Sequence, residues 1–416
     1  MIFRFLFFLA LLLLVDLYFF QSIKTIFNPL QEVKRYWAYR IYWGITVAGL
    51  LFTLFSLITY QNPVVPRIYY LYAFCFLLIL FVSKLIGSLP LMLEDVGRFI
   101  KWLVAFFQKG SMPASSTGMS RGKFISYSAL GLAAIPFSTM LFGMVKTAFD
   151  FKLRRVKIPI ANLPEAFEGM KIIQISDIHS GSFISAAHFK NAVELINKEN
   201  PDAIFFTGDL VNDRSSEAEP FIEVWKELKS KFGVFSILGN HDYGDYVIWE
   251  NAEDKKANFA RLLEIHREMG WDLLRNEHRI LEKDGQKIAL LGVENWGSSL
   301  RFPKKGDMQA AQNNLEAVPV KILLSHDPSH WDAVITQTYK DIDLTLSGHT
   351  HGFQFGIEIP GIKWSPSQYV YPHWAGHYTQ NNQHLYVNRG LGFLGYLGRV
   401  GIRPEITILE LSRNQA

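Results

Sequence analysis

Four long apolar runs near the N-terminus constrain this chain most. A helix needs roughly 20 mostly apolar residues to cross the hydrocarbon core of a bilayer, and four stretches approach that length: residues 2–20, 41–60, 68–92 and 125–145. Four such runs are hard to bury inside a soluble fold. We therefore expect about four transmembrane helices over residues 1–150, in preference to a buried helical hairpin. The first run lacks the small-residue cleavage site of a signal peptide, so we expect an uncleaved anchor.

Two charged residues, Asp16 and Lys84, interrupt the apolar runs. Ionisable groups inside a membrane can mark a transport or proton path. Both residues lie toward the ends of their runs, however, where a side chain reaches the interface at lower cost. We therefore expect both to snorkel, and with so little intramembrane polarity a transporter is disfavoured.

The loops between the runs indicate the orientation, because Lys and Arg are enriched on the cytoplasmic side. The loops after the first and third runs are basic, whereas the short second loop holds only Arg67. This asymmetry predicts a multi-pass protein of the cell membrane with an extracytoplasmic C-terminal domain; the basic stretch 146–157 favours the opposite side. Residues 98–107 are either an interfacial helix or a continuation of the third span, and residues 109–123 are predicted to form a flexible loop.

Composition changes along the chain. All twelve histidines lie between His179 and His384, and the only cysteine is Cys75, inside an apolar run. The rest of the chain therefore has no disulfide and no thiolate metal site. A formal net charge of +4 is small for 416 residues, so no nucleic-acid partner is expected. The length suits two or three domains, and we predict a transmembrane anchor region over residues 1–150 and a second domain over 151–416.

Short apolar runs in the second domain each end in polar, metal-binding residue types. The predicted strands 171–176, 203–207, 234–238, 321–324 and 344–346 precede Asp177 and His179, Asp209, Asn240 to Asp242, His326, and His349 and His351, in that order. Predicted helices at 187–199 and 257–269 alternate with the strands, which indicates an α/β domain. In such domains ligand residues gather at the carboxyl ends of the strands.

The residue types at these strand ends define the chemistry. Carboxylate and amide oxygens with imidazole nitrogens, and no sulfur, suit Mn, Fe, Zn or Ni. Neighbouring glycines permit the sharp turns that aim several side chains at one point. Two ions sharing a bridging carboxylate are suited to hydrolysis of phosphate esters. His188, His266, His278 and His330 lie outside the pattern and are expected to be surface or core residues.

At these motifs the chain resembles the calcineurin-like metallophosphoesterase superfamily, in its membrane-associated bacterial branch. The similarity covers about residues 152–412 and includes ILGNHDY (237–243), ILLSHDP (322–328), LSGHTHG (346–352), YVNRGLG (386–392) and PEITIL (404–409). The resemblance implies a four-layer fold, with two facing β-sheets flanked by helices. It also implies two divalent metal ions, the first held by Asp177, His179, Asp209 and His351, the second by Asp209, Asn240, His326 and His349.

The resemblance further implies that His241 protonates the leaving group or hydrogen-bonds to it. Many relatives place an Asp three residues after the bridging Asp to orient this histidine, but here Asn212 stands there. Asp213 or Asp242 is then a candidate for the orienting role. Tyr243 is a further candidate for lining the site, and Arg389 for contacting a phosphate.

The leading hypothesis is therefore a metal-dependent phosphomonoesterase or phosphodiesterase at the membrane, acting on a lipid or lipid-linked phosphate. A soluble phosphomonoester or cyclic nucleotide is the alternative substrate. A non-catalytic module on the same fold is a separate alternative, although none of the expected ligands is missing. The Gly-rich segment 390–401 lacks the strand–helix context of a dinucleotide site and is predicted to form an exposed apolar lip.

Overall fold

The computed structural model describes residues 2–59, 68–108 and 121–413. Arg67 and most of the predicted loop 109–123 lie outside these residues. The chain divides into two compact units, Met1–Phe142 and Gly143–Ala416, here called the helical unit and the sheet unit. Each unit is described by itself below.

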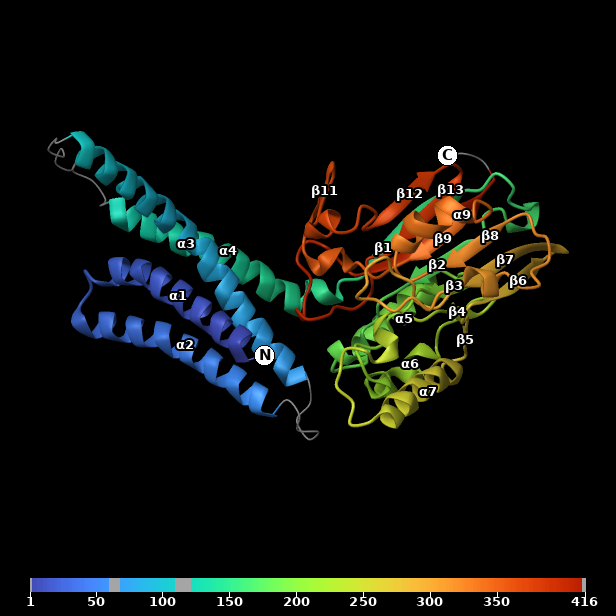
Figure 1. Cartoon of the computed structure of the whole chain (residues 1–416), viewed down its shortest axis with the longest axis horizontal. Helices are drawn as coiled ribbons and strands as arrows, with labels where there is room; N and C mark the ends of the chain where they lie inside the picture. The colour runs from blue at the N-terminus through green and yellow to red at the C-terminus, as the bar shows by residue number, and fades with distance from the viewer. Residues whose placement is uncertain (1, 60–67, 109–120, 414–416) are drawn as a thin grey trace. The chain divides into compact units, whose positions relative to one another are not determined.

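The helical unit is built from four long helices (Figure 1): α1 (Ile2–Phe27), α2 (Glu32–Thr59), α3 (Ile68–Gln108) and α4 (Arg121–Val145). All four are long and apolar enough to cross a membrane, as the sequence predicts. The segment 98–107 continues α3 without a break, so it is not a separate interfacial helix.

Asp16 and Lys84, the two charged residues within the apolar runs, do not snorkel to the interface, which corrects the sequence prediction. Asp16 of α1 and Lys84 of α3 form an ion pair, and both are almost fully buried. The Thr46 hydroxyl of α2 donates to Asp16 Oδ1 at 2.8 Å and lies 3.0 Å from Lys84 Nζ. Pairing between helices removes the need for either charge to reach the interface, because each neutralises the other inside the bundle.

The sheet unit contains two six-stranded sheets (Figure 1). The first has the order β1-β14-β2-β3-β4-β5 and the second β12-β13-β9-β8-β7-β6. Their bounds are β1 (Lys152–Pro159), β2 (Lys171–Ile175), β3 (Ala203–Phe206), β4 (Val234–Ser236), β5 (Trp271–Leu273), β6 (Glu277–Lys283), β7 (Gln286–Gly292), β8 (Lys321–Leu324), β9 (Leu344–Ser347), β12 (Gly376–Gln380), β13 (Gln383–Val387) and β14 (Glu405–Ser412). A separate hairpin pairs β10 (Ile357–Ile359) with β11 (Ile362–Trp364).

Strand alternation explains why the two sheets face each other. On β7, Ile288 and Leu290 join the central core with residues of the first sheet, such as Phe205. Their neighbours Ala289 and Leu291 point to the opposite face, where they pack with Trp331 and other residues. Successive side chains of a strand point to opposite faces, so each sheet has one face in the central core and one under helices.

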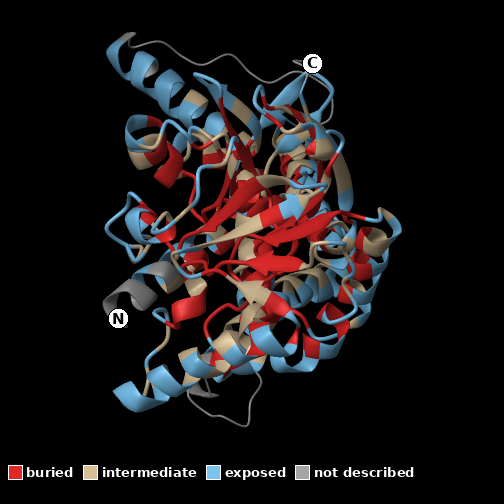
Figure 2. Ribbon diagram, turned by 90° about the vertical axis from the view of Figure 1, so that its right-hand side faces the viewer, coloured by how far each residue is buried: buried red, intermediate tan, exposed pale blue. Residues whose placement is uncertain are grey.

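Helices complete the outer layers. The helices α5 (Ala187–Lys198), α6 (Ile222–Trp225) and α7 (Ala252–Glu268) lie beside the first sheet, and α9 (Thr336–Thr338) lies beside the second (Figure 1). Met308 and Ala311 of α8 (Met308–Ala311) pack against the second sheet. Buried residues concentrate in the strands between them (Figure 2). The structure therefore confirms the predicted four-layer fold. Helix α4 ends at Val145 and β1 begins at Lys152, so a short segment of chain joins the last long helix to the first strand.

Candidate metal centre

The predicted ligands meet where the two sheets face each other. They stand in the loops that follow β2, β3 and β4 of the first sheet and β8 and β9 of the second. These strands are neighbours within their sheets and are parallel, so their carboxyl ends lie side by side. The fold thus brings together residues that are far apart in the chain, such as His179 and His351, which are 172 positions apart.

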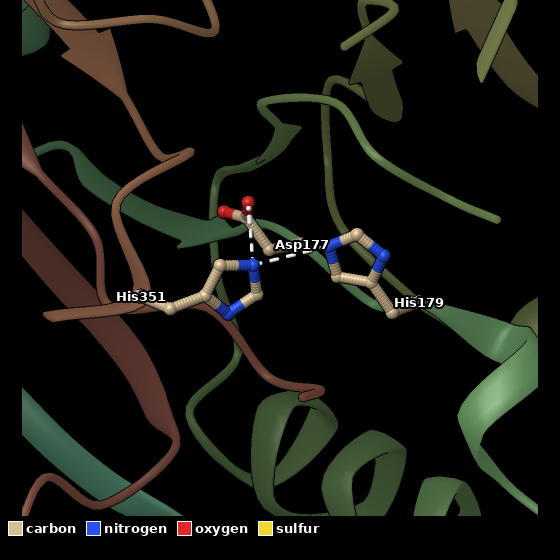
Figure 3. Close-up of side chains that lie close together, drawn as sticks. All are labelled: Asp177, His179 and His351. Atoms are coloured by element: carbon tan, nitrogen blue, oxygen red, sulfur yellow. Dashed lines mark hydrogen bonds and ion pairs between the residues drawn. The ribbon is translucent and has the colours of Figure 1, made fainter. Parts of the chain in front are cut away.

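Asp177, His179 and His351 form the first group, whose ligand atoms lie within 4.8 Å of one another. His351 Nε2 lies 3.2 Å from Asp177 Oδ1 and 3.0 Å from His179 Nε2. Figure 3 shows the three side chains pointing toward one another. All three are buried.

Asp209, His326 and His349 form the second group, again within 4.8 Å. His326 Nε2 lies 3.1 Å from Asp209 Oδ2 and 3.3 Å from His349 Nδ1. The same oxygen, Asp209 Oδ2, is also 3.6 Å from His179 Nε2 of the first group. This carboxylate therefore stands between the two groups.

Hydrogen bonds on the far side of each ring fix the nitrogen that faces the site. His326 Nδ1 donates to the Thr207 carbonyl at 2.7 Å, which leaves Nε2 free toward Asp209. His179 Nδ1 lies 3.0 Å from the Asn212 side-chain oxygen, and His349 Nε2 lies 2.8 Å from the Tyr371 hydroxyl. Such outer contacts are typical of histidines that bind metals.

Asn240 provides a direct test of whether the site suits a cation. Its side-chain nitrogen donates to the Tyr246 hydroxyl at 2.9 Å. Its Oδ1 is buried and has no hydrogen-bond partner among the residues that the structure describes. A buried acceptor without a partner is costly, and a divalent ion would satisfy it. The donor set of oxygen and imidazole nitrogen fits the same conclusion.

Charges in the site are strongly coupled. Burial raises the pKa of Asp209, but His326 and His241 outweigh it and hold that pKa well below its usual value. Burial lowers the pKa of His326, yet the Asp209 carboxylate raises it to about 10. The Asp209 carboxylate is therefore ionised. The positive charge of the protonated His326 ring balances it, a role that a metal ion would take if one were bound.

The backbone at the ligands is held in an unusual conformation. Asp177, His179, Asp209, His349 and His351 all have φ between 49° and 70°. That left-handed region costs an L-residue roughly 1–2 kcal/mol, so the surrounding structure must impose it. Close packing is part of this, because a Cβ on Gly239 would lie only 2.3 Å from Asp209 Oδ1.

His241 lies beside both groups and is partly buried. Its ring centroid is 5.0 Å from that of His179, and its main-chain N–H donates to Asp209 Oδ1 at 2.8 Å. Its Nδ1 donates to the main-chain carbonyl of Asn212 at 2.6 Å. The ring is therefore oriented by Asn212, through the backbone and not through a carboxylate.

Asp242 does not orient His241, which corrects one of the two sequence expectations. Its carboxylate accepts from the main-chain N–H groups of Asp209, Leu210 and Gly239 at 2.8–2.9 Å. It thereby ties the loop after β3 to the loop after β4. Asp213 is buried, and its main-chain N–H lies 3.3 Å from Glu217 Oε2.

Arg389 and Tyr243 also differ from expectation. The Arg389 guanidinium is buried and ion-paired with Glu405 and Glu358, so it is not free to contact a phosphate. Tyr243 is buried, and its hydroxyl accepts from the Asn295 main-chain N–H at 3.1 Å. Both residues support the structure around the site.

The segment 390–401 is mostly buried, so the predicted apolar lip is wrong there. Leu391, Phe393 and Leu397 pack inside the unit. Arg399 of this segment is fully buried; it donates to the Arg389 carbonyl at 2.8 Å and lies 3.3 Å from His351 Nδ1. Burial lowers its pKa to about 9.

Sequence reasoning missed Tyr246, Tyr371 and Arg399. Tyr246 touches both Asn240 and His241, its ring centroid lying 4.5 Å from that of His241. Tyr246 stands four residues after the Gly-Asn-His-Asp motif, and this closeness in the sequence is the signal that could have found it. Tyr371 and Arg399 belong to loops whose approach to the site depends on the fold.

The fold and the two ligand groups are those of a metallophosphoesterase domain, which follows the four apolar helices in the chain. Residues 170–353 match the family model of the calcineurin-like phosphoesterase, and residues 2–148 match that of the probable calcineurin-like phosphoesterase transmembrane domain. The chain belongs to the calcineurin-like metallophosphoesterase family.

Curated relatives agree with this assignment. The uncharacterized metallophosphoesterase YkuE of Bacillus subtilis is 33% identical over 60% of this chain and 81% of its own length. The transmembrane protein with metallophosphoesterase domain of Danio rerio is 30% identical over 66% of this chain, and the match spans 60% of that protein's length. The phosphodiesterase YaeI of Escherichia coli is 28% identical over 58% of this chain and 82% of its own length.

Proposed function

We propose that this protein hydrolyses a phosphate ester, a phosphomonoester or phosphodiester, at the membrane surface with two divalent cations. One observation carries the proposal: a single oxygen, Asp209 Oδ2, lies 3.1 Å from a ring nitrogen of one ligand group and 3.6 Å from that of the other. A carboxylate in that position suits a bridging role between two ions.

The proposed ligand sets follow from the two groups. Asp177, His179, Asp209 and His351 would hold one ion. Asp209, Asn240, His326 and His349 would hold the other, with Asn240 contributing the buried Oδ1 described above. When bound, such ions supply Lewis acidity toward the phosphoryl oxygens and lower the pKa of water. Mn, Fe and Zn all suit these ligands.

His241 is the proposed acid. Because Nδ1 donates to the Asn212 carbonyl, Nε2 is the ring atom left to donate a proton to a leaving oxygen. The ring is partly exposed, whereas His179, His326 and His351 are buried, so His241 is better placed than those three rings to meet a substrate. General acid catalysis of this kind typically contributes about 10²–10⁴-fold.

A phosphate carried by a lipid or lipid-linked molecule is the proposed substrate class, because four membrane-spanning helices anchor the unit that carries the site. A soluble phosphomonoester or cyclic nucleotide is the competing class. The complete ligand set argues against a non-catalytic module. The extracytoplasmic side is the proposed location, on the charge of the loops alone.

The test uses the full chain, purified in detergent and loaded with Mn²⁺. Hydrolysis of a chromogenic phosphomonoester, a chromogenic phosphodiester, a cyclic nucleotide and a phospholipid monoester is compared at equal metal content. Elemental analysis should give close to two ions per chain in the parent protein and fewer in Asp209→Asn. His241→Ala should keep its metal while losing turnover. A protein with both ions bound that hydrolyses none of these esters would contradict the proposal.

A further inference from the structure

The hairpin of β10 and β11 has its polar and apolar faces reversed. Cross-strand partners are Ile357 with Trp364 and Ile359 with Ile362, while Glu358 pairs with Lys363. Because partners in register share a face, the four apolar residues lie on one side and the two charged residues on the other. The apolar side chains are 39–55% exposed.

The charged face of the hairpin is the one fixed to the body of the sheet unit. Glu358 forms ion pairs with Arg154 of β1 and with Arg389. Lys363 Nζ donates to the Ala375 carbonyl and lies 4.9 Å from the centre of the Trp374 ring. These polar contacts therefore direct the apolar face away from the sheet unit. In water the opposite arrangement, with apolar side chains buried and charged ones exposed, is normally favoured.

Exposed apolar residues recur beside the ligand groups in a regular way. Tyr246 and Phe302 contact His241 and His349 respectively, and the exposed side chains of Ile248 and Leu300 stand two residues from them. Tyr371 contacts His349, and the exposed Tyr369 again stands two residues away.

These segments hold nearly all the large apolar side chains that the sheet unit exposes. Among its described residues, only Val145 and Ile184 are exposed outside the segments 246–248, 300–302 and 353–370. Exposed apolar side chains that are concentrated in a few segments in this way are typical of an interaction surface.

In the polypeptide, this surface is linked by a short segment to the last of the four long helices. Six residues lie between the end of α4 at Val145 and the start of β1 at Lys152, a reach of at most about 25 Å. The strand β1 carries Arg154, which holds the polar face of the hairpin. The hairpin is thus fixed to the strand that directly follows the last membrane-spanning helix.

We propose that the apolar face of the hairpin, with Ile248, Leu300 and Tyr369, is a bilayer-contact surface that lies in the lipid interface around the metal-ligand groups. Trp364 and Tyr369 are of the types enriched at that depth, and Trp364 Nε1 lies 3.4 Å from the Tyr369 hydroxyl. Aliphatic side chains beside them would enter the boundary between headgroups and acyl chains.

The experiment uses the full chain with Cys75 changed to Ala, reconstituted in vesicles of phosphatidylcholine and phosphatidylglycerol. Ile362→Cys is labelled with an environment-sensitive fluorophore. Gln380→Cys, an exposed polar position at the end of β12, is the matched control. Emission is recorded with and without phosphatidylcholine carrying a nitroxide near the top of its acyl chain.

The label at position 362 should show blue-shifted emission and lose intensity with the nitroxide lipid, while the label at 380 should do neither. Emission at 362 equal to that at 380 would overturn the proposal. So would a blue shift without nitroxide quenching, because protein and not lipid would then cover the face. Ile359→Cys gives the same measurement on the other strand if the first variant folds poorly. No turnover is measured, so the result is independent of the proposed hydrolase activity.

Discussion

Asn212 contacts His241 through its backbone and a ligand histidine through its side chain. Its carbonyl accepts the His241 Nδ1 proton at 2.6 Å, and its Oδ1 lies 3.0 Å from His179 Nδ1. Its Nδ2 donates to the Ser182 hydroxyl at 3.1 Å, which fixes the amide so that the oxygen faces His179. One residue thus positions both the proposed acid and a proposed ligand.

Asn212→Ala is therefore expected to weaken metal binding while leaving the backbone contact to His241 in place. Loss of such an outer contact typically costs about 10–100-fold in metal affinity. Asn212→Asp, which retains an acceptor for His179, should bind metal at least as tightly as the parent. Calorimetric titration of the apo-protein with Mn²⁺ measures both. Equal affinities for the Ala and Asp variants would refute the role assigned to the side chain.

Gly239→Ala is expected to abolish metal loading. The added methyl group would lie 2.3 Å from Asp209 Oδ1, closer than any stable contact, so the carboxylate would have to leave its place between the two groups. Gly233→Ala is the matched control, because it has a positive φ but nothing within 4 Å of the added Cβ. That variant should lose about 1–3 kcal/mol of stability through backbone strain and keep its metal by elemental analysis.

Acid should destabilise the sheet unit through two histidines outside the metal groups. Burial lowers the pKa of His266 to about 3 and that of His330 to about 4. The unfolded chain protonates them near their ordinary value of 6.5, and the folded chain does not. Stability is therefore fully present above pH 6.5 and falls as the pH drops toward 4, by about 1.4 kcal/mol per pH unit for each residue.

His266→Gln should flatten this pH dependence, since glutamine takes up no proton. Thermal unfolding from pH 5 to 8 measures the slope for each protein. His188→Gln is the comparison, because His188 is only partly buried and stacks on Phe149. Burial lowers the pKa of His188 as well, so its slope should change in the same direction but by less than that of His266→Gln. An unchanged slope in His266→Gln would show that His266 is not a source of acid lability.

The ion pair between Asp16 and Lys84 is expected to stabilise the helical unit because the two charges neutralise each other. Lys84→Met leaves the Asp16 carboxylate unpaired between α1 and α3, and removing one partner of a buried pair costs about 3–5 kcal/mol. The double variant Asp16→Asn with Lys84→Met should recover most of that loss. Heating in detergent followed by size-exclusion chromatography measures the folded fraction. Failure of the second change to restore it would exclude charge pairing as the cause.

The orientation is expected to place residue 416 outside the cytoplasm, because the two basic loops are retained inside. Alkaline phosphatase fused after Ala416 should be active in cells, and green fluorescent protein fused at the same position should be dark. The reverse pattern would put the site in the cytoplasm.

That the candidate ligands gather in one place could be predicted, because each follows a short apolar strand and has a side chain of a metal-binding type. Asp177, Asp209 and His326 are found by that rule alone. The contacts that orient them were not predictable, since they depend on atoms without sequence signature. A main-chain carbonyl orients His241, and Asn240 depends on the Tyr246 hydroxyl. The sequence predicts an exposed apolar surface at the Gly-rich segment 390–401, but that segment is mostly buried and the hairpin of β10 and β11 is exposed instead. Composition does not tell which loops the fold buries.

Asp16 and Lys84 illustrate the same limit in the helical unit. The sequence shows only where each residue lies in its own apolar run, whereas its partners lie on other helices. A pairing across 68 residues is a property of the bundle and not of either run.

The six residues between α4 and β1 have a kinetic consequence. A site joined to the membrane helices by so short a segment would meet a substrate carried in the bilayer by diffusion in two dimensions. The relevant concentration of such an ester is therefore its surface density. Turnover should then respond to dilution of that ester by inert lipid within each vesicle, and be indifferent to dilution of the vesicles themselves. The membrane helices would thus determine both where the reaction takes place and that enzyme and substrate meet by diffusion within the plane of the membrane.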